Sequence, residues 1–197
     1  MTTTNEDRLG GRLPLLSPEA MTDAQRALYA DFKGSWVKFA DSIGVQSTTA
    51  DGRLIGPFNF FLLHPEVTTQ LSALQKAEER HTTLPPRTRE LAIITTGAVW
   101  GARYELYARA HAARAAGLTQ DMVDTLVAGG IPEGLDANER IAARLARALA
   151  TEHRVDDALY RQAEAAFGTQ GLYDLVAVMG VYMTVCAGLA LFEVPAP

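Results

Sequence analysis

Apolar residues recur at helical spacing along most of the chain. In residues 23–40 they form one apolar face, which consists of Leu28, Phe32, Trp36 and Phe39. Thr22 and Gln25 stand three residues apart at the start of this segment, as in the capping box that begins a helix. Residues 42–57 are rich in serine, threonine and glycine. The pattern therefore predicts a helix over 23–40 and then a loop.

Proline and glycine mark the ends of the helices that follow. Pro65 and Pro86 occupy first helical positions, which predicts one helix to about residue 80 and another that ends near Gly101. The next helix covers YELYARAHAARAAGL, residues 104–118, in which Gly117 supplies the left-handed residue that ends it. Thr119 caps the next predicted helix, and Asp136 and Glu139 form another capping box. The last predicted helices cover about 137–151, 156–167 and 171–192.

No stretch of convincing length alternates apolar and polar residues as a strand does. The pattern therefore predicts an all-α fold, a compact bundle of about seven or eight helices joined by short turns. A chain of 197 residues has the usual size of one domain. We expect a single domain over 1–197, with residues 12–50 as an N-terminal helical extension.

Charge and cysteine content exclude several classes of protein. The net charge of −5, without a basic stripe, argues against a nucleic-acid binder. Cys186 is the only cysteine, which excludes an internal disulfide and a CxxC redox pair, and its apolar neighbours indicate a buried thiol. The first residues, MTTTNEDRLG, lack the basic and apolar stretches of a secretory leader, so we expect a cytoplasmic protein.

One segment has to be compared with a membrane span. LVAVMGVYMTVCAGLALF, residues 175–192, is uncharged over about the shortest length that crosses a bilayer. It lacks flanking lysine or arginine and is bounded by Asp174 and Glu193. A helix that is apolar on all sides is also what a buried core or a subunit interface requires. We therefore predict a buried helix of a homo-oligomer and no membrane contact.

Three stretches together resemble a known family. They are DGRLIGPFNFFLLHPEV at 51–67, LPPRTRELAIITTGAVWGARYELYARAHAARAAGL at 84–118, and the apolar last helix that ends in FEVPAP. Their order and spacing are similar to those of the carboxymuconolactone decarboxylase and alkylhydroperoxidase D-like superfamily, over about residues 12–197. The resemblance implies an all-α fold and a homo-oligomer, commonly a trimer or hexamer, and is unspecific for the reaction.

Peroxidase members of this superfamily use a glutamate, a CxxC pair and a histidine as a proton relay to the thiols. Aligned on the family's glycine, the resemblance places these groups at Glu90, Ala102, Glu105 and Arg109. Only the glutamate is retained here. A thiol peroxidase needs two sulfurs within bonding distance, so the resemblance implies no peroxidase of this kind.

His111 is not expected to replace the missing histidine. It lies two positions beyond Arg109, and at about 100° per residue its side chain points to the opposite face of the helix. The spacing instead predicts that His111 shares a face with Tyr104 and Tyr107.

The candidate catalytic residues are Glu90, Glu105 and Arg109. Glu90 is either a general acid or base in an apolar pocket or a first-turn glutamate that interacts with the helix dipole. Glu105 and Arg109 stand four apart, as in an exposed helical ion pair that contributes about 0.3–0.5 kcal/mol. The resemblance places them in the family's active pocket instead, where Arg109 would hold a substrate carboxylate and Glu105 would orient the guanidinium.

Six further residues are candidates for substrate binding: Phe58, Asn59, His81, Trp100, Tyr104 and His111. Each has a structural alternative, because aromatic residues after a loop also anchor it to the core and turn histidines are commonly exposed. The four histidines show no HExxH motif or short paired spacing, so we expect no metal site. We also expect no cofactor.

Two functional hypotheses follow from different classes of protein. The first is a cofactor-independent lyase (decarboxylase) or isomerase that acts on a small carboxylated or lactone-like organic acid. Arg109 would bind the anion, Glu90 would transfer the proton, and Glu105 would orient both. The second is a non-catalytic, oligomeric ligand-binding or scaffold protein, since the cysteines and the aligned histidine are missing.

Overall fold

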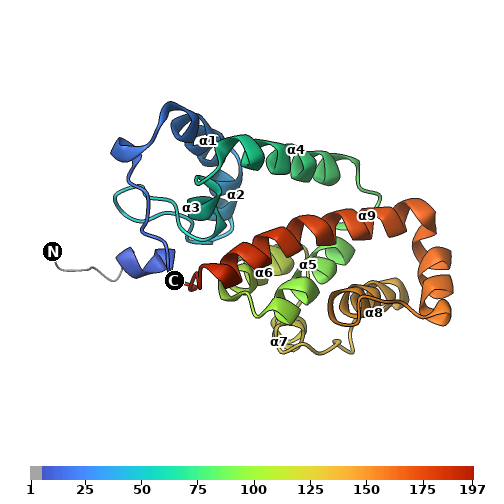
Figure 1. Cartoon of the computed structure of the whole chain (residues 1–197). Helices are drawn as coiled ribbons and strands as arrows, with labels where there is room; N and C mark the ends of the chain where they lie inside the picture. Colours follow the sequence, from blue (N-terminus) through green and yellow to red (C-terminus); the bar gives the residue numbers. More distant parts are fainter. Residues whose placement is uncertain (1–5) are drawn as a thin grey trace.

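The computed structural model describes residues 6–197, and these fold into a bundle of α-helices (Figure 1). Two short 3₁₀ helices, Glu6–Gly10 and Pro18–Ala20, precede the bundle. The α-helices are α1 Asp23–Gly34, α2 Trp36–Ser42, α3 Pro57–Phe61, α4 Pro65–His81, α5 Pro86–Trp100, α6 Arg103–Ala115, α7 Gln120–Val127, α8 Ala137–Thr151 and α9 Asp157–Leu191. The expected absence of a leader rests on residues 1–10, of which 1–5 lie outside the described residues.

The all-α fold is confirmed, and most helices begin and end where local signals placed them. The Asp136 side chain accepts a hydrogen bond from the Glu139 backbone at 2.8 Å, which closes the predicted capping box of α8. Gly101 and Gly117 have φ values of 59° and 91°, so both end helices in the left-handed region. These ends depend on neighbouring residues alone, which is why the sequence predicts them.

The helix predicted over 23–40 is divided in two. Ser35 lies between α1 and α2 with φ −123° and ψ −95°, and its hydroxyl donates to the Asp31 carbonyl at 2.6 Å. A serine side chain that bonds the preceding turn competes with the helical backbone bonds. The Trp36 ring then stacks on Phe32 with 5.5 Å between ring centroids. The break therefore gives α2 a direction of its own.

The core is built around α5. This helix packs against α6, α7, α8 and α9, and it lies at the centre of the bundle in Figure 1. Leu91, Ile93 and Ile94 are fully buried, although they point in different directions from the helix axis. A helix enclosed by neighbours is apolar on several sides, as the sequence of α5 is.

Helices α1 to α4 form a second layer beside this bundle (Figure 1). α4 lies along α9, and α3 contacts α9 as well. The segment before α1 is bound to the C-terminal end of the chain, because the Arg12 backbone donates to the Phe192 carbonyl at 2.7 Å. The N-terminal extension thus packs on the helices that build the core.

α9 joins the two helices predicted over 156–167 and 171–192. They meet at Gly168, whose φ of 64° kinks the chain. Among the described residues, α9 is the one helix that is long and apolar enough to cross a membrane, and 50% of its most apolar window is buried inside the protein. A core helix of a soluble protein meets the same criteria of length and composition.

Gly56 allows the loop before α3 to lie directly against the Tyr104 ring. Its φ is 64° and ψ −143°, a conformation almost restricted to glycine, and a Cβ at this position would overlap the ring. We expect Gly56→Ala to lower the free energy of unfolding by about 2–5 kcal/mol, from backbone strain and overpacking together. Urea denaturation measures this loss. Gly101→Ala is the control, because Gly101 also has positive φ but no atom within 4 Å of an added Cβ, and should cost about 1 kcal/mol.

Candidate functional site

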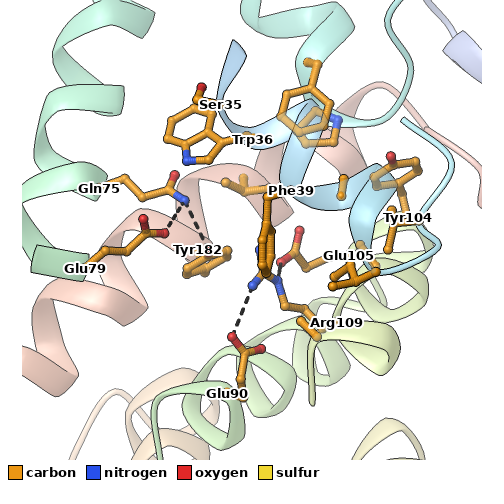
Figure 2. A pocket seen from close by; sticks show the side chains of 18 of the residues that line it. Ser35, Trp36, Phe39, Gln75, Glu79, Glu90, Tyr104, Glu105, Arg109 and Tyr182 are labelled. Atoms are coloured by element: carbon orange, nitrogen blue, oxygen red, sulfur yellow. Dashed lines mark hydrogen bonds and ion pairs between the residues drawn. The ribbon is translucent and has the colours of Figure 1, made fainter. Parts of the chain in front are cut away.

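A pocket of about 530 Å³ lies between the two layers of helices. This volume falls in the range of small-molecule sites, about 300–1,000 Å³. One wall is apolar and largely aromatic, and the opposite side carries charged groups, which we call the floor (Figure 2). The apolar wall consists of Trp36, Phe39, Ala40, Ile43, Val45, Pro57, Phe58 and Phe61. Helix α4 adds Gln75, Lys76 and Glu79, and α9 adds Tyr182 and Val185.

The structure brings the three candidate catalytic residues together on the floor. Arg109 Nε donates to Glu105 Oε1 at 2.8 Å, and Arg109 Nη1 lies 3.3 Å from Glu90 Oε1. Glu90 comes from the first turns of α5, whereas the other two lie one turn apart on α6. The guanidinium therefore joins the two helices through their carboxylates, as Figure 2 shows.

This cluster is buried, unlike an ordinary surface ion pair. The side chains of Glu105 and Arg109 are 4% and 19% exposed. Burial raises the pKa of Glu105 above its ordinary value, against the opposing effect of the adjacent guanidinium. The exposed ion pair considered from the sequence is therefore excluded, and the charges form part of the pocket.

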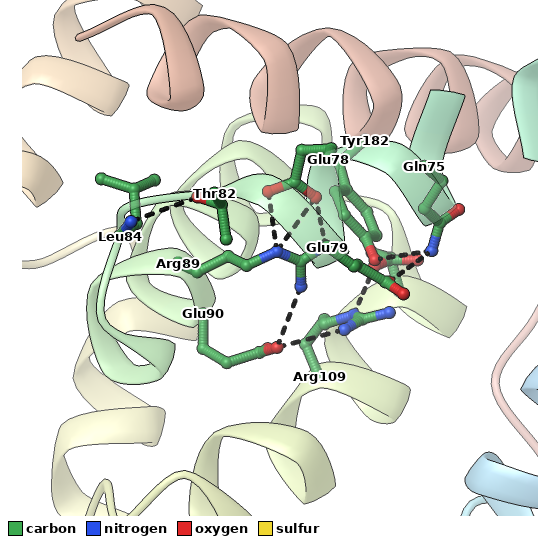
Figure 3. A network of polar contacts seen from close by, with 10 residues as sticks. Gln75, Glu78, Glu79, Thr82, Leu84, Arg89, Glu90, Arg109 and Tyr182 are labelled. Atoms are coloured by element: carbon green, nitrogen blue, oxygen red, sulfur yellow. Dashed lines mark hydrogen bonds and ion pairs between the residues drawn. The ribbon is translucent and has the colours of Figure 1, made fainter. Parts of the chain in front are cut away.

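A second arginine, Arg89, extends the network towards α4 (Figure 3). It pairs with Glu78 at 2.6 Å, with Glu79 at 3.3 Å, and lies 3.7 Å from Glu90 Oε1. Glu78 is itself buried, with 2% of its side chain exposed. Glu90 thus lies between two guanidiniums, those of Arg89 and Arg109.

Tyr182 connects the network to α9. Its ring lies under the Arg109 guanidinium, 4.7 Å from ring centroid to Cζ. Its hydroxyl oxygen accepts a hydrogen bond from Gln75 Nε2 at 3.3 Å. Within residues 6–197 no hydrogen bond donated by this hydroxyl is formed, so its proton is available to a ligand. Burial raises the pKa of Tyr182 to about 12, so the hydroxyl keeps its proton at neutral pH.

Glu90 retains one unused oxygen. Oε1 interacts with Arg109, whereas Oε2 is buried and has no hydrogen-bond partner among the described residues. A buried polar atom without a partner is costly, and such atoms are found where a ligand or reacting group completes the contact. Glu90 is one of the residues that line the pocket.

Two of the six predicted substrate-binding residues line the pocket, Phe58 and Tyr104. Phe58 packs against Phe32 with ring centroids 5.5 Å apart. The Tyr104 hydroxyl donates to the Gln46 carbonyl at 2.8 Å, so the ring faces the pocket while its polar atom is already bound.

The other four predicted binding residues lie outside the lining. Asn59 is buried, and its amide binds the N-terminal segment at Leu16 and Pro14. His81 and Trp100 end α4 and α5 with exposed side chains. His111 Nδ1 lies 3.0 Å from the Ile43 carbonyl. Asn59 and His111 are therefore held by contacts within the protein, whereas His81 and Trp100 face solvent.

The predicted role of Arg109 as a carboxylate clamp stays a prediction, and its Nε and Nη1 already interact with the protein carboxylates of Glu105 and Glu90. The predicted face of α6 is confirmed, since Tyr107 makes edge contacts with both the Tyr104 and His111 rings.

Cys186 is buried as expected, and burial raises the pKa of its thiol. Within residues 6–197 no three histidine, cysteine or carboxylate side chains form a metal-binding group.

Five residues of the network were not predicted from the sequence: Arg89, Tyr182, Gln75, Glu78 and Glu79. Two signals were present. Arg89 directly precedes Glu90, and Tyr182 is one of the few hydroxyl side chains in the uncharged segment 175–192. Buried tyrosine hydroxyls usually find a polar partner, so a tyrosine in such a segment indicates a polar contact inside the protein.

The all-α bundle that holds this site has the fold of a solved structure. The crystal structure of an uncharacterized peroxidase-related protein from Silicibacter sp. TM1040 has this fold, with a TM-score of 0.72 and 14% sequence identity. The match covers 100% of this chain and 95% of that one. No protein with a curated description matches significantly. Residues 65–148 match the sequence model of the carboxymuconolactone decarboxylase family.

Proposed function

We propose that this protein is a cofactor-independent enzyme, of the decarboxylase or isomerase type, that acts on a small organic acid or lactone. Glu90 transfers the proton. The observation that carries the proposal is the buried, unpartnered Oε2 of Glu90, a residue that lines the pocket. The match of residues 65–148 to the carboxymuconolactone decarboxylase family model supports this class of reaction.

Both reactions pass through an enolate next to a carbonyl group. In a decarboxylation, the bond between carbon and carboxylate breaks, its electron pair enters the conjugated carbonyl, carbon dioxide leaves, and Glu90 protonates the carbon. In an isomerisation, Glu90 removes a proton from one carbon and returns it to another. The protein supplies a positioned acid or base in either case, an effect of about 10²–10⁴-fold.

The neighbours of Glu90 suit this task. Arg109 and Arg89 fix its carboxylate from two sides through Oε1. The aromatic wall makes one side of the pocket apolar, and apolar surroundings strengthen electrostatic interactions with a developing enolate. Glu105 in turn holds Arg109 in place.

The test is a panel of small organic acids, lactones and cyclic ketones incubated with the purified protein in deuterated water. Mass spectrometry detects loss of carbon dioxide, and it also detects the deuterium that proton transfer at carbon introduces. We expect at least one compound to be decarboxylated or exchanged faster than without protein. Binding without either reaction across the panel would favour the ligand-binding protein that lacks catalysis.

Assembly and location remain predictions. We propose a homo-oligomer, a trimer or hexamer, with no nucleic-acid or membrane partner, in the cytoplasm. Exposed apolar side chains on α9, which include Tyr173, Val176 and Leu191, agree with burial against another subunit. Light scattering coupled to gel filtration determines the molar mass in solution. A mass equal to that of a single chain would contradict the proposed oligomer.

A further inference from the structure

The charges of the pocket are balanced without a ligand. Each cation in the lining has a carboxylate partner within the protein. Lys76 pairs with Asp31 at 2.8 Å. The guanidinium of Arg89 is held by Glu78 and that of Arg109 by Glu105, at 2.6 and 2.8 Å. An incoming anion therefore finds no cation that is free of a protein carboxylate.

The balance also does not become positive when Glu105 is neutral. Burial raises the pKa of Glu105, which favours the uncharged form. The carboxylates that remain around the three cations are Asp31, Glu78, Glu79 and Glu90. They still outnumber the cations. A substrate carboxylate would be desolvated beside like charges, a cost that only a free cation could offset.

A neutral polar group, by contrast, finds a hydrogen-bond donor in the pocket. The Tyr182 hydroxyl accepts from Gln75 and has its own proton available for donation, and Tyr182 lines the pocket. The Arg109 guanidinium lies over its ring and also contacts Glu90, so the hydroxyl donor and the free carboxylate oxygen flank one side chain. A carbonyl oxygen can accept from Tyr182 while the carbon next to the carbonyl faces Glu90. Figure 3 shows Tyr182, Arg109 and Glu90 within one polar network.

The aromatic wall determines the rest of the ligand. Trp36, Phe39, Phe58 and Phe61 supply ring faces and edges to a pocket of about 530 Å³. Such walls bind flat apolar rings. We propose that the pocket takes a neutral cyclic carbonyl compound, a lactone or cyclic ketone on an apolar ring, and discriminates against free carboxylates.

This proposal rests on the proposed function only for the fate of the ligand. With a neutral carbonyl compound, Glu90 takes a proton from the carbon next to the carbonyl. The electron pair moves to the carbonyl oxygen, where Tyr182 stabilises the enolate by a hydrogen bond. Glu90 then returns the proton to a conjugated carbon. Within the proposed class, the inference selects isomerisation over decarboxylation.

Three compounds with one ring system test the discrimination. They are 1-indanone, which is a neutral ketone, indane-1-carboxylate, and indane, which has no polar group. Calorimetric titration of the whole protein at neutral pH should show 1-indanone binding about tenfold or more tightly than the carboxylate. Equal or tighter binding of the carboxylate would overturn the proposal, as would no binding of 1-indanone at millimolar concentration.

Tyr182→Phe tests the hydrogen bond. We expect binding of 1-indanone to weaken about three- to tenfold, whereas binding of indane stays the same. Tyr107→Phe is the matched control, because Tyr107 lies outside the lining and its hydroxyl accepts from Gln46 at 2.8 Å. An equal loss for indane and 1-indanone would show that Tyr182 only supports the shape of the pocket.

Glu90→Gln tests the charge balance by a gain of binding, which misfolding cannot produce. Removing this negative charge lessens the repulsion of an anion beside Arg109, and indane-1-carboxylate should bind about tenfold more tightly than to the unchanged protein. No gain would count against the proposal. These binding results are independent of turnover, so a protein that binds the ketone without proton exchange would refute the proposed function and leave the ligand class intact.

Discussion

Glu90→Gln should lower turnover of the protein's substrate by about 10²–10⁴-fold while binding of neutral ligands persists. Glutamine preserves the shape of the side chain and still interacts with its neighbours, but it cannot accept and return a proton. Deuterium exchange into a compound that the screen identifies measures the effect directly. Because the free energy of unfolding should change little, the loss belongs to the chemical step and not to the fold.

Glu139→Gln is the matched control for this loss. Glu139 is also buried, 7% exposed, and pairs with Arg87 at 2.7 Å, but it lies outside the pocket between the helices. Glutamine serves in a capping box as glutamate does, so α8 keeps its N-terminal cap. Turnover should remain within about twofold of the unchanged protein. Residual activity of Glu90→Gln near that of this control would remove Glu90 from the proposed chemistry.

Arg109→Met should lower the free energy of unfolding by about 3–5 kcal/mol at neutral pH. The substitution leaves Glu105 buried without its partner and removes the cation over the Tyr182 ring. An exposed pair would lose only about 0.3–0.5 kcal/mol, so urea denaturation separates the two cases by a wide margin. The double variant Arg109→Met with Glu105→Leu should recover part of the loss, because no buried charge remains.

The loss in free energy of unfolding caused by Arg109→Met, which we call the deficit, should depend on pH. The pKa of Glu105 in the folded protein is already raised by burial, and loss of the guanidinium raises it further. A carboxyl with a raised folded pKa contributes stability below its unfolded value, 4.5, and loses it as pH rises through the folded value. The deficit should therefore shrink on acidification towards pH 4.5. A deficit that is constant with pH would mean that lost packing, not the charge of Glu105, causes it.

Helix positions were accessible from the sequence because their signals are local. The capping pair of Asp136 and Glu139 and the prolines at 65 and 86 act within one turn of the helix that they begin. The break at Ser35 was missed because the apolar spacing continues through it. It depends on stacking of Trp36 on Phe32 and on the direction in which α2 meets the rest of the pocket.

The charged floor was accessible only in part. Glu105 and Arg109 stand four apart on one helix, so their contact follows from helical geometry. Glu78 and Arg89 lie on different helices, α4 and α5, and Gln75 meets Tyr182 across 107 positions of the sequence. Such contacts arise from packing between helices, which no local pattern reports. The same packing places Asn59 and His111 away from the pocket.

The charged and the uncharged residues that line the pocket come from different parts of the sequence, and this separation affects how a new ligand specificity can arise. Every charged side chain of the pocket falls within residues 65–148, the part that matches the family. The lining residues before and after that part are uncharged, and those before it, 35–61, supply the aromatic wall. Substitutions there can reshape the cavity for a different ring while the proton-transferring groups stay fixed. Residues 35–61 are therefore the segment to randomise when a laboratory library seeks variants with altered ligand preference.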